Sequence, residues 1–416
     1  MAKIIAINAG SSSLKFKFFE MNNEQVLAQG VFDRIGIPKG TIKIKYGKEK
    51  YEKEEELKDH SAAVKKLLQL LLDLKIVHNF SEIKGVGHRV VAGGEYFKKS
   101  ARVTTRVIRR INDLAEYAPI HNPANLMGIK AFKKILPDAV SVAVFDTSFH
   151  QTMPKQNFIF SVPYEWYHNY GVRRYGAHGT SHRYVVEVAA KMMNKPLSKL
   201  KLISCHLGAG ASLCAVKNGK SFDTSMGFTP LTGITMATRS GDADVAMISF
   251  MMQKLDMHSM PEVIYDLNKK SGLLGISGIS SDMRDIEAKR ESNERARLAI
   301  DIFVKDVVKY IGAYTAEMGG VDGIIFTAGI GENSSYIREK IMDRLAFLGI
   351  QVDKEANKKR GVAEFIVTPA SKIAVMVIPT NEELMIARDV EKVIKKESSK
   401  EQVSNKKTLS VRAHSN

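Results

Sequence analysis

Cysteine is nearly absent from this chain of 416 residues, which contains only Cys205 and Cys214. Two thiols cannot build a disulfide framework or a four-cysteine zinc site. Both stand in apolar runs, so we expect reduced core residues on strands. No apolar run approaches the roughly 20 residues that a membrane helix needs, and the run after Lys3 is too short for a signal peptide. These absences predict a cytoplasmic protein with no membrane partner.

Acidic residues are the scarcer charged type, with 45 Asp and Glu against 62 Lys and Arg, which gives a net charge of +17. Such a balance suits nucleic acid, an acidic membrane surface or an anionic substrate. The sequence carries no zinc-finger, helix-turn-helix or aromatic RNA-binding signature, and its basic residues are spread along the chain. We therefore expect a solvated basic surface and no nucleic-acid partner. The Ser-, Lys- and Asn-rich segment 397–416 predicts a disordered basic tail.

Apolar periodicity predicts an α/β protein with two comparable sets of strands and helices. Strands are predicted at 4–7, 14–19, 41–46, 83–91, 140–145, 202–206, 211–216, 323–327 and 373–378, and helices at 62–76, 124–136, 182–193, 294–318 and 382–395. Two mixed sheets covered by helices follow from this order. Ligands are then expected at the carboxyl ends of the strands.

Two Gly-rich hairpin patterns recur about 200 residues apart. In the first, an apolar run reaches Asn8-Ala9-Gly10-Ser11-Ser12-Ser13-Leu14-Lys15; in the second, another reaches His206-Leu207-Gly208-Ala209-Gly210-Ala211. Small residues let backbone N–H groups approach an anion, and the serine hydroxyls add donors. Two related halves, each with a phosphate-binding turn, predict a phosphotransferase.

Four residues that stand just after apolar runs or in Gly-rich loops suit phosphoryl transfer, which needs positioning and charge neutralisation. Arg89 and Arg239 offer guanidinium groups, Asp146 a carboxylate, and His178 an imidazole. Each has a structural alternative, such as a surface ion pair for Arg89 or a loop cap for Asp146. No GxxxxGK[ST] phosphate loop is present, so the phosphate site is of another kind.

Together these motifs resemble the acetate kinase family, within the acetokinase group of the actin/hexokinase/Hsp70-like superfamily. The blocks that carry the resemblance are Asn8–Lys15, Phe145–Thr147 with His150–Pro154, and Arg173–Gly176, and matches extend from Asn8 to Asp389. The resemblance implies a two-domain actin-like (ribonuclease H-like) fold with a duplicated mixed sheet and flanking helices. It places an N-terminal lobe at 1–147 with 380–396 and a nucleotide-binding lobe at 148–379.

The resemblance also implies a reaction: reversible in-line phosphoryl transfer from ATP to acetate, giving acetyl phosphate and ADP. Mg²⁺, with Mn²⁺ as the alternative, and a homodimer are expected with it. The implied catalytic residues are Asp146, His178, Arg239 and Arg89. Arg89, Val91, His121, Ala177 and Pro230 would face the acid, and Asn8 and Glu382, with Glu383 as the neighbouring alternative, would hold the metal. The nucleotide would lie against Lys15, Ser11, Ser13, His206, Leu207, Gly208, Ala209, Gly210, Asp282, Met283, Arg284, Gly329, Ile330, Gly331, Glu332 and Asn333.

Five small or uncharged residues depart from the family pattern inside or beside these motifs. The family usually has His at Ala92, Phe at Ala177, Asn at Ala209, Glu at Thr232 and Gly at Ala237. A wider acyl pocket at Ala177 would admit propionate or a longer acid, because one methylene is worth only about 1–3 kcal/mol. The alternatives are therefore a propionate or butyrate kinase, or a catalytically weakened nucleotide- or nucleic-acid-binding protein.

Overall fold

The computed structural model describes residues 2–119 and 121–413. The chain forms two compact units, Met1–Ser148 with Asn381–Asn416 and Phe149–Thr380. The divisions after Ser148 and after Thr380 lie one residue beyond the expected divisions after 147 and 379. No helix in the described part of the chain is long and apolar enough to cross a bilayer.

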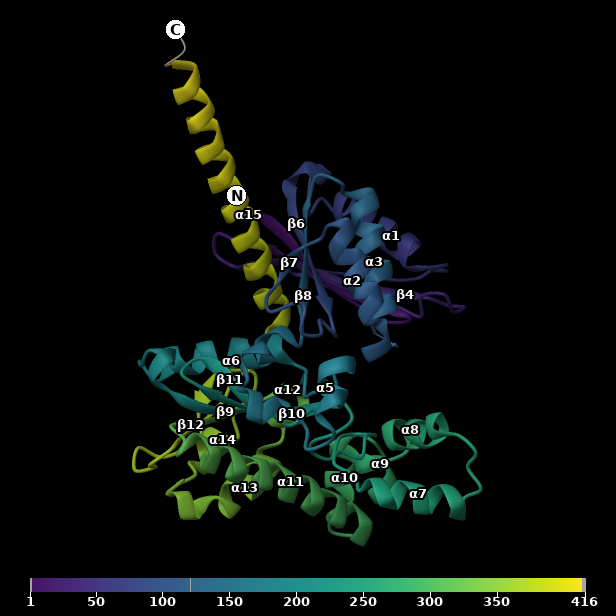
Figure 1. Cartoon of the computed structure of the whole chain (residues 1–416), viewed down its shortest axis with the longest axis vertical. Coiled ribbons are helices and arrows are strands. Elements are labelled where there is room, and N and C mark those ends of the chain that lie inside the picture. Colours follow the sequence, from purple (N-terminus) through teal and green to yellow (C-terminus); the bar gives the residue numbers. More distant parts are fainter. Residues whose placement is uncertain (1, 120, 414–416) are drawn as a thin grey trace. The chain divides into compact units, whose positions relative to one another are not determined.

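Unit 1 is a mixed sheet with helices on both faces (Figure 1). Its elements are β1 Lys3–Ala9, β2 Ser13–Glu20, β3 Gln25–Asp33, β4 Thr41–Tyr46, β5 Glu49–Glu54, α1 His60–Asp73, η1 Phe80–Glu82, β6 Ile83–Val90, β7 Ala101–Arg102, α2 Thr105–Asp113, η2 Leu114–Tyr117, α3 Asn122–Ile135, β8 Val140–Phe145 and α15 Glu382–Ala413. The strand order is β5-β4-β3-β2-β1-β6-β8-β7, with β1, β6 and β8 parallel.

Alternate residues of the central strands of unit 1 face different helices. Ile5, Ile7 and Val86 point into a core with α1 and α3. Gly85 and Gly87 lie on the opposite face, where α15 packs. A Cβ at either glycine would overlap side chains of α15, namely Val390 at Gly85 and Ile386 at Gly87. The missing side chains therefore let α15 approach the sheet closely, which fixes where its first turn lies.

Gly87→Ala is expected to destabilise the protein by about 1–3 kcal/mol, because the new methyl group would overpack α15. Urea unfolding followed by circular dichroism measures the change. Gly312→Ala is the matched control, since Gly312 lies in a helix and an added Cβ there would meet nothing within 4 Å. That control should be neutral or gain about 0.5–1 kcal/mol. Equal effects at the two positions would contradict the packing argument.

Unit 2 repeats the arrangement with a smaller sheet. Its elements are η3 Ser148–Thr152 at the crossing between the units, α4 Lys155–Phe158, α5 Tyr164–Tyr170, α6 Gly179–Met192, η4 Leu197–Lys199, β9 Lys201–Leu207, β10 Ala211–Lys217, β11 Lys220–Thr224, α7 Val245–Lys254, α8 Met260–Lys269, α9 Gly272–Ser277, α10 Met283–Lys289, α11 Glu294–Met318, β12 Gly323–Thr327, α12 Ala328–Asn333, α13 Ser335–Arg344, η5 Ala346–Leu348, α14 Lys354–Asn357, β13 Glu364–Phe365 and β14 Ala374–Val377. The strand order is β11-β10-β9-β12-β14-β13.

The two sheets share one topology, which confirms the expected duplication. In each, a hairpin (β1–β2 or β9–β10) is followed in space by two strands parallel to its first strand, β6 and β8 in unit 1 and β12 and β14 in unit 2. In unit 2, α6 covers one face of the sheet, and α11 and α13 cover the other (Figure 1). The predicted α/β class with two mixed sheets and flanking helices is confirmed.

Several local predictions need correction. Residues 329–333, which the resemblance places against the nucleotide and for which no helix was predicted, lie in the short helix α12. Helix α6 begins at Gly179, three residues before the predicted start. α15 continues to Ala413, through most of the segment for which composition predicts disorder; Lys, Glu and Gln there are strong helix formers. The predicted reduced, buried state of Cys205 and Cys214 is confirmed.

Candidate active site

The functional side chains of unit 1 share the sheet face that α15 covers. Asn8 pairs with Lys15 across the β1–β2 hairpin. Ile7 pairs with His88 in the parallel β1–β6 ladder, so Asn8 lies beside Arg89 one residue further on. Asp146 follows β8 directly, and its N–H donates to the carbonyl of Val90 (3.0 Å). The carboxyl ends of three parallel strands therefore bring an amide, a guanidinium and a carboxylate together.

Arg89 and Asp146 form a bidentate ion pair. Nε of Arg89 lies 3.0 and 3.1 Å from the two carboxylate oxygens of Asp146, and Nη2 lies 2.7 Å from Oδ2. The Asp146 side chain is only 2% exposed, whereas that of Arg89 is 21% exposed. Asp146, with Glu382 and Glu383 also contributing, raises the pKa of Arg89. Arg89 is thus a permanent cation, held in one orientation by a buried carboxylate.

The first turn of α15 adds two carboxylates to this face. Glu383 accepts a hydrogen bond from Nζ of Lys17 at 3.0 Å. Burial raises the pKa of Glu382 to about 7; Arg89 acts against this shift, while Asp146 and Glu383 add to it. Asn381 caps the helix, since its Oδ1 accepts from the N–H of Leu384. Close packing of α15 on Gly87 thus places crowded negative charge next to Arg89.

Two buried asparagines of α3, which the sequence analysis missed as positioning residues, hold the loop after β6. Asn125 donates to the carbonyl of Ala9 (2.8 Å) and accepts from the N–H of Val91 (3.2 Å). Asn122 exchanges two hydrogen bonds with the backbone of Ala92, both 3.1 Å. Val91 is thereby tied to the end of β1. The predicted His121 lies exposed at the start of α3.

In the hairpin after β1, the N–H of Gly10 donates to the carbonyl of Ser13 at 2.8 Å. Ser11 is exposed at the turn, and Lys15 is exposed on the sheet face. The expected serine-rich tight turn is confirmed as a hairpin, because β1 and β2 pair as far as Ala9 and Leu14.

Unit 2 carries the histidine of the predicted catalytic set. His178 is the N-cap residue of α6, with a left-handed backbone at φ +56° and ψ +20°. Its Nδ1 lies 2.9 Å from Oγ of Ser212, and its ring stacks on His206 with centroids 4.1 Å apart. The imidazole is therefore fixed on both its face and its Nδ1 edge.

Arg239 converges with His178 on the turn between β9 and β10. A Cβ added to Gly210 would lie 3.3 Å from Nη1 of Arg239 and 3.6 Å from Nε2 of His178. Nη1 of Arg239 also donates to the carbonyl of Pro230 (3.1 Å). Burial lowers the pKa of Arg239, and no acidic side chain in the described ranges pairs with it. A desolvated guanidinium beside a Gly-rich turn is suited to bind an anion.

A pocket of about 840 Å³ opens in unit 2 next to this turn. Eight residues predicted to bind nucleotide line it: Gly208, Ala209, Asp282, Met283, Arg284, Gly329, Ile330 and Asn333. Its volume is in the range of small-molecule sites. The other residues that line the pocket were not predicted from the sequence: Ala237, Ser281, Glu287, Ala288, Arg290, Ser334, Ser335, Tyr336 and Arg360. The guanidinium of Arg290 lies 4.7 Å from the ring centroid of Tyr336, so this wall pairs an aromatic face with a cation.

Five predicted nucleotide residues of unit 2 do not line the pocket, namely His206, Leu207, Gly210, Gly331 and Glu332, and neither do Ser11, Ser13 and Lys15 of unit 1. Leu207 is fully buried in the core. Glu332 serves the backbone instead, because its Oε1 accepts from the N–H groups of Ala328 (2.8 Å) and Thr380 (3.0 Å). Two of the residues that depart from the family pattern are in contact here, because the N–H of Ala237 donates to the carbonyl of Ala209 at 3.1 Å.

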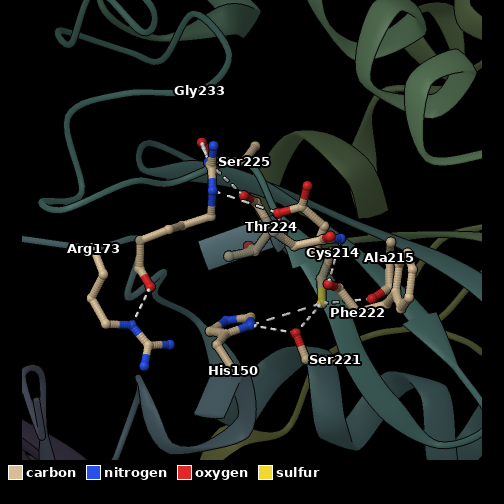
Figure 2. A network of polar contacts seen from close by, with 12 residues as sticks. His150, Arg173, Cys214, Ala215, Ser221, Phe222, Thr224, Ser225 and Gly233 are labelled. Carbon is tan, nitrogen blue, oxygen red and sulfur yellow. Dashed lines mark hydrogen bonds and ion pairs between the residues drawn. The ribbon is translucent and has the colours of Figure 1, made fainter. Parts of the chain in front are cut away.

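The paired arginines of the Arg173–Gly176 motif have structural contacts. Arg173 stacks over Phe158 at 3.6 Å and donates from Nε to the carbonyl of Arg174. Arg174 donates from Nη1 to the carbonyl of Thr224 (2.8 Å) (Figure 2). His150 lies 2.8 Å from the hydroxyl of Ser221, and its Nε2 donates to the carbonyl of Ala177 (2.8 Å). These contacts tie the segment before His178 to β11. Figure 2 shows His150 beside Ser221 of β11 and Cys214 of β10.

The chain is similar to known proteins of one enzyme family. The model of the acetokinase family matches residues 3–388. The acetate kinase of Fructilactobacillus sanfranciscensis is 57% identical over 397 residues, which cover 95% of this chain and all of that protein. The crystal structure of Porphyromonas gingivalis acetate kinase superposes with a TM-score of 0.91 at 43% identity, covering 95% of this chain and all of that one. The crystal structure of a propionate kinase from Francisella tularensis superposes with a TM-score of 0.87 at 40% identity, covering 94% of this chain and 99% of that one.

Fold, site and comparisons define a kinase that transfers a phosphoryl group to a carboxylate. The chain belongs to the acetokinase family. Membership implies ATP as co-substrate and a divalent metal.

Proposed function

We propose that this chain is an acetate kinase, which transfers the terminal phosphoryl group of ATP to acetate and gives acetyl phosphate and ADP by direct in-line transfer. The observation that carries the proposal is the convergence of His178 and Arg239 at Gly210, beside a nucleotide-sized pocket. The names and identities of the curated relatives support the same activity. ATP is assigned to the pocket of unit 2.

The chemical difficulty is electrostatic, because an acetate oxygen and a phosphoryl group are both anionic. Arg239 and His178 would neutralise charge on the phosphoryl oxygens. Arg89 would attract the acid, with Asp146 holding its guanidinium in place. Acetate is ionised at neutral pH, so little general-base help is needed, and Asp146 acts chiefly by positioning. Lys15, Ser11 and Ser13 are proposed as further phosphate contacts.

The residues present fit a divalent cation. Asn8 and Glu382 offer hard oxygen donors. Burial, with Asp146 and Glu383 also contributing, raises the pKa of Glu382, and a bound cation would favour its charged form. Within the described ranges no three His, Cys, Asp or Glu side chains form a cage. Mg²⁺ suits such a sparse site, because it usually keeps several waters and takes one or two carboxylates plus substrate phosphates. When bound, Mg²⁺ (or Mn²⁺) would neutralise phosphate charge.

A homodimer is proposed from one face of unit 2. Helices α7 and α8 expose large apolar side chains: Val245 is 77% exposed, Leu255 58% and Tyr265 57%. Phe250 of α7 is 56% exposed as well, and large exposed apolar side chains gathered in one region mark interaction surfaces. A second copy of the chain would cover them. A cytoplasmic location is proposed with this assignment.

The direct test is an assay with ATP, Mg²⁺, acetate and hydroxylamine, which converts an acyl phosphate into a coloured hydroxamate. Hydroxamate formation that depends on both ATP and acetate is expected. The absence of product with acetate, propionate and butyrate would overturn the kinase assignment. In that case, salt-sensitive binding of DNA or RNA would favour the nucleic-acid alternative.

Propionate is the second candidate acid, because Ala177 replaces the larger residue usual in the family and one similar structure is a propionate kinase. Comparing kcat/KM for acetate, propionate and butyrate separates the candidates. Acetate is expected to give the highest value. A preference for propionate would overturn the assignment of acetate as the substrate, but it would keep the assignment of phosphoryl transfer to a carboxylate.

Ala177→Phe is expected to raise the ratio of kcat/KM for acetate over propionate roughly tenfold, because the ring would fill space that one extra methylene needs. Since Ala177 is only 4% exposed, thermal unfolding should accompany the kinetics. Ala237→Gly restores a family residue in the nucleotide pocket and serves as the control, with no change in acid preference expected. An unchanged ratio in a folded Ala177→Phe enzyme would refute the pocket assignment.

A further inference from the structure

A chain of hydrogen-bonding groups runs from the interior of unit 2 to His178. His182 is fully buried, and both of its ring nitrogens contact serine hydroxyls: Nδ1 lies 2.9 Å from Oγ of Ser204, and Nε2 lies 2.9 Å from Oγ of Ser212. Ser212 is also fully buried and is 2.9 Å from Nδ1 of His178. The order of the chain is thus Ser204, His182, Ser212, His178.

The number of protons in this chain is limited. Burial, with His150 and His206 also contributing, holds the pKa of His182 well below its ordinary value, so this ring is neutral and has one N–H. The hydroxyl of Ser212 has one proton and two histidine neighbours. It can donate to only one of them and must accept from the other.

The direction of donation along this chain decides which nitrogen of His178 carries a proton. If Ser212 donates to Nδ1 of a neutral His178, the proton of that ring is on Nε2, while His182 donates to Ser212 and Ser204 donates to His182. If His178 is protonated, Nδ1–H donates to Ser212 and the chain reverses, so that Ser212 donates to His182 and His182 donates to Ser204. A neutral His178 could also donate from Nδ1 in the reversed chain, but the hydroxyl of Ser204 would then need another acceptor, and its one contact among those of the described residues is Nδ1 of His182. The order in which Ser204 donates to His182 satisfies that hydroxyl and leaves the proton of the neutral His178 ring on Nε2. The imidazolium has a proton on Nε2 in any case.

We propose that Ser212, backed by His182 and Ser204, is a positioning residue that keeps an N–H on Nε2 of His178 in both protonation states of that ring. This is the nitrogen that lies near Gly210 and Arg239. An anion at the Gly-rich turn then always meets a donor and never a lone pair. The proposal deepens the proposed kinase function, on which its catalytic consequence rests.

The other groups that face His178 do not replace this role. His206 stacks on the face of the imidazole, and its own Nδ1 contacts Oγ of Ser181 at 2.8 Å. Arg239 lies on the Nε2 side, next to Gly210. His150 lies one ring further away, 5.8 Å from His182. Of these groups, only Ser212 has an oxygen at Nδ1.

The test compares Ser212→Ala with Ser204→Ala, two buried hydroxyl deletions of which only the first touches His178. Long-range ¹⁵N–¹H NMR of histidine-labelled protein reports the tautomer of His178, assigned from the signal that is lost in His178→Asn. The wild type should show Nε2–H above the pKa of the ring. Ser212→Ala should show a mixture with Nδ1–H, whereas Ser204→Ala should keep Nε2–H. This readout needs no activity, so it stands apart from the kinase assignment.

The kinetic counterpart is the pH profile of kcat. Ser212→Ala should match the wild type at low pH, where the imidazolium has both protons, and fall about tenfold at high pH. Ser212→Thr, which keeps the hydroxyl, should restore the high-pH arm. Nδ1–H in the wild type, an unchanged tautomer in Ser212→Ala, or an equal loss of kcat at every pH would overturn the proposal.

Discussion

Replacing Arg239 with methionine is expected to lower kcat about 10²–10³-fold, the cost of removing one preorganised donor from a developing anion. The same change should leave the folded protein as stable as before or more so. Burial lowers the pKa of Arg239, which means that the folded state disfavours its charge, and no carboxylate in the described chain compensates. Methionine keeps most of the apolar stem without that cost. Steady-state kinetics and urea unfolding measure the two effects.

Arg338→Met is the matched control for the opposite effects that Arg239→Met is expected to have on activity and on stability. Arg338 is fully buried, whereas Arg239 is partly buried, and the pKa of Arg338 is lowered to about 10, chiefly by burial. Its donors are nevertheless used: Nε bonds Oδ1 of Asn357 (2.8 Å), Nη1 bonds the carbonyl of Gly331 (2.9 Å), and Nη2 bonds the carbonyl of Asn357. Losing it leaves buried acceptors unpaired, so stability should fall by several kcal/mol. If Arg239→Met destabilised the protein as much, the anion-site assignment would fail.

Arg89→Met is expected to reduce both activity and stability. The loss of kcat/KM for the acid should again be about 10²–10³-fold, because the cation that faces the acid is gone. Asp146 would keep a buried carboxylate without its bidentate partner, and breaking a buried pair in this way costs about 3–5 kcal/mol. Adding Asp146→Asn should recover much of the stability and none of the activity, since it removes the orphaned charge but restores no cation.

The control for this pair is Arg388, which makes a similar bidentate contact with Glu24, with distances of 2.6 and 2.7 Å. Its side chain is 24% exposed and that of Glu24 36% exposed, so the pair is partly solvated. Arg388→Met should cost about 1 kcal/mol or less and leave kcat intact. Parallel losses in Arg89→Met and Arg388→Met would mean that Arg89 has only a structural role.

The sequence predicted the parts of the site that depend on local pattern. Arg89 and Asp146 follow apolar strands, and parallel strands must bring their ends to one edge of a sheet. The Gly-rich turn at 208–210 was likewise visible as small residues between apolar runs. The sequence did not show that His178 and Arg239 lie close to Gly210, because this closeness depends on where α6 begins and on how the loop that follows β11 folds back.

Other features were missed because they arise only from tertiary packing. Gly85 and Gly87 look like weak points in a strand until α15, almost 300 residues later, is seen against them. Asn122 and Asn125 have the spacing of any helix face, and only their hydrogen bonds to the loop after β6 reveal their purpose. Ser212 is an ordinary small strand residue in sequence; its two histidine neighbours come from α6.

The late position of α15 in the chain has a consequence for biosynthesis. The ribosome completes the sheet of unit 1 and then makes residues 149–380 before the helix that seals it exists. At roughly 5–20 residues per second, this interval is about 10–50 s. During that time the sheet face around Gly85 and Gly87 has no α15 to cover it and is exposed on the nascent chain. Holdase chaperones, which bind exposed apolar surface, would bind there.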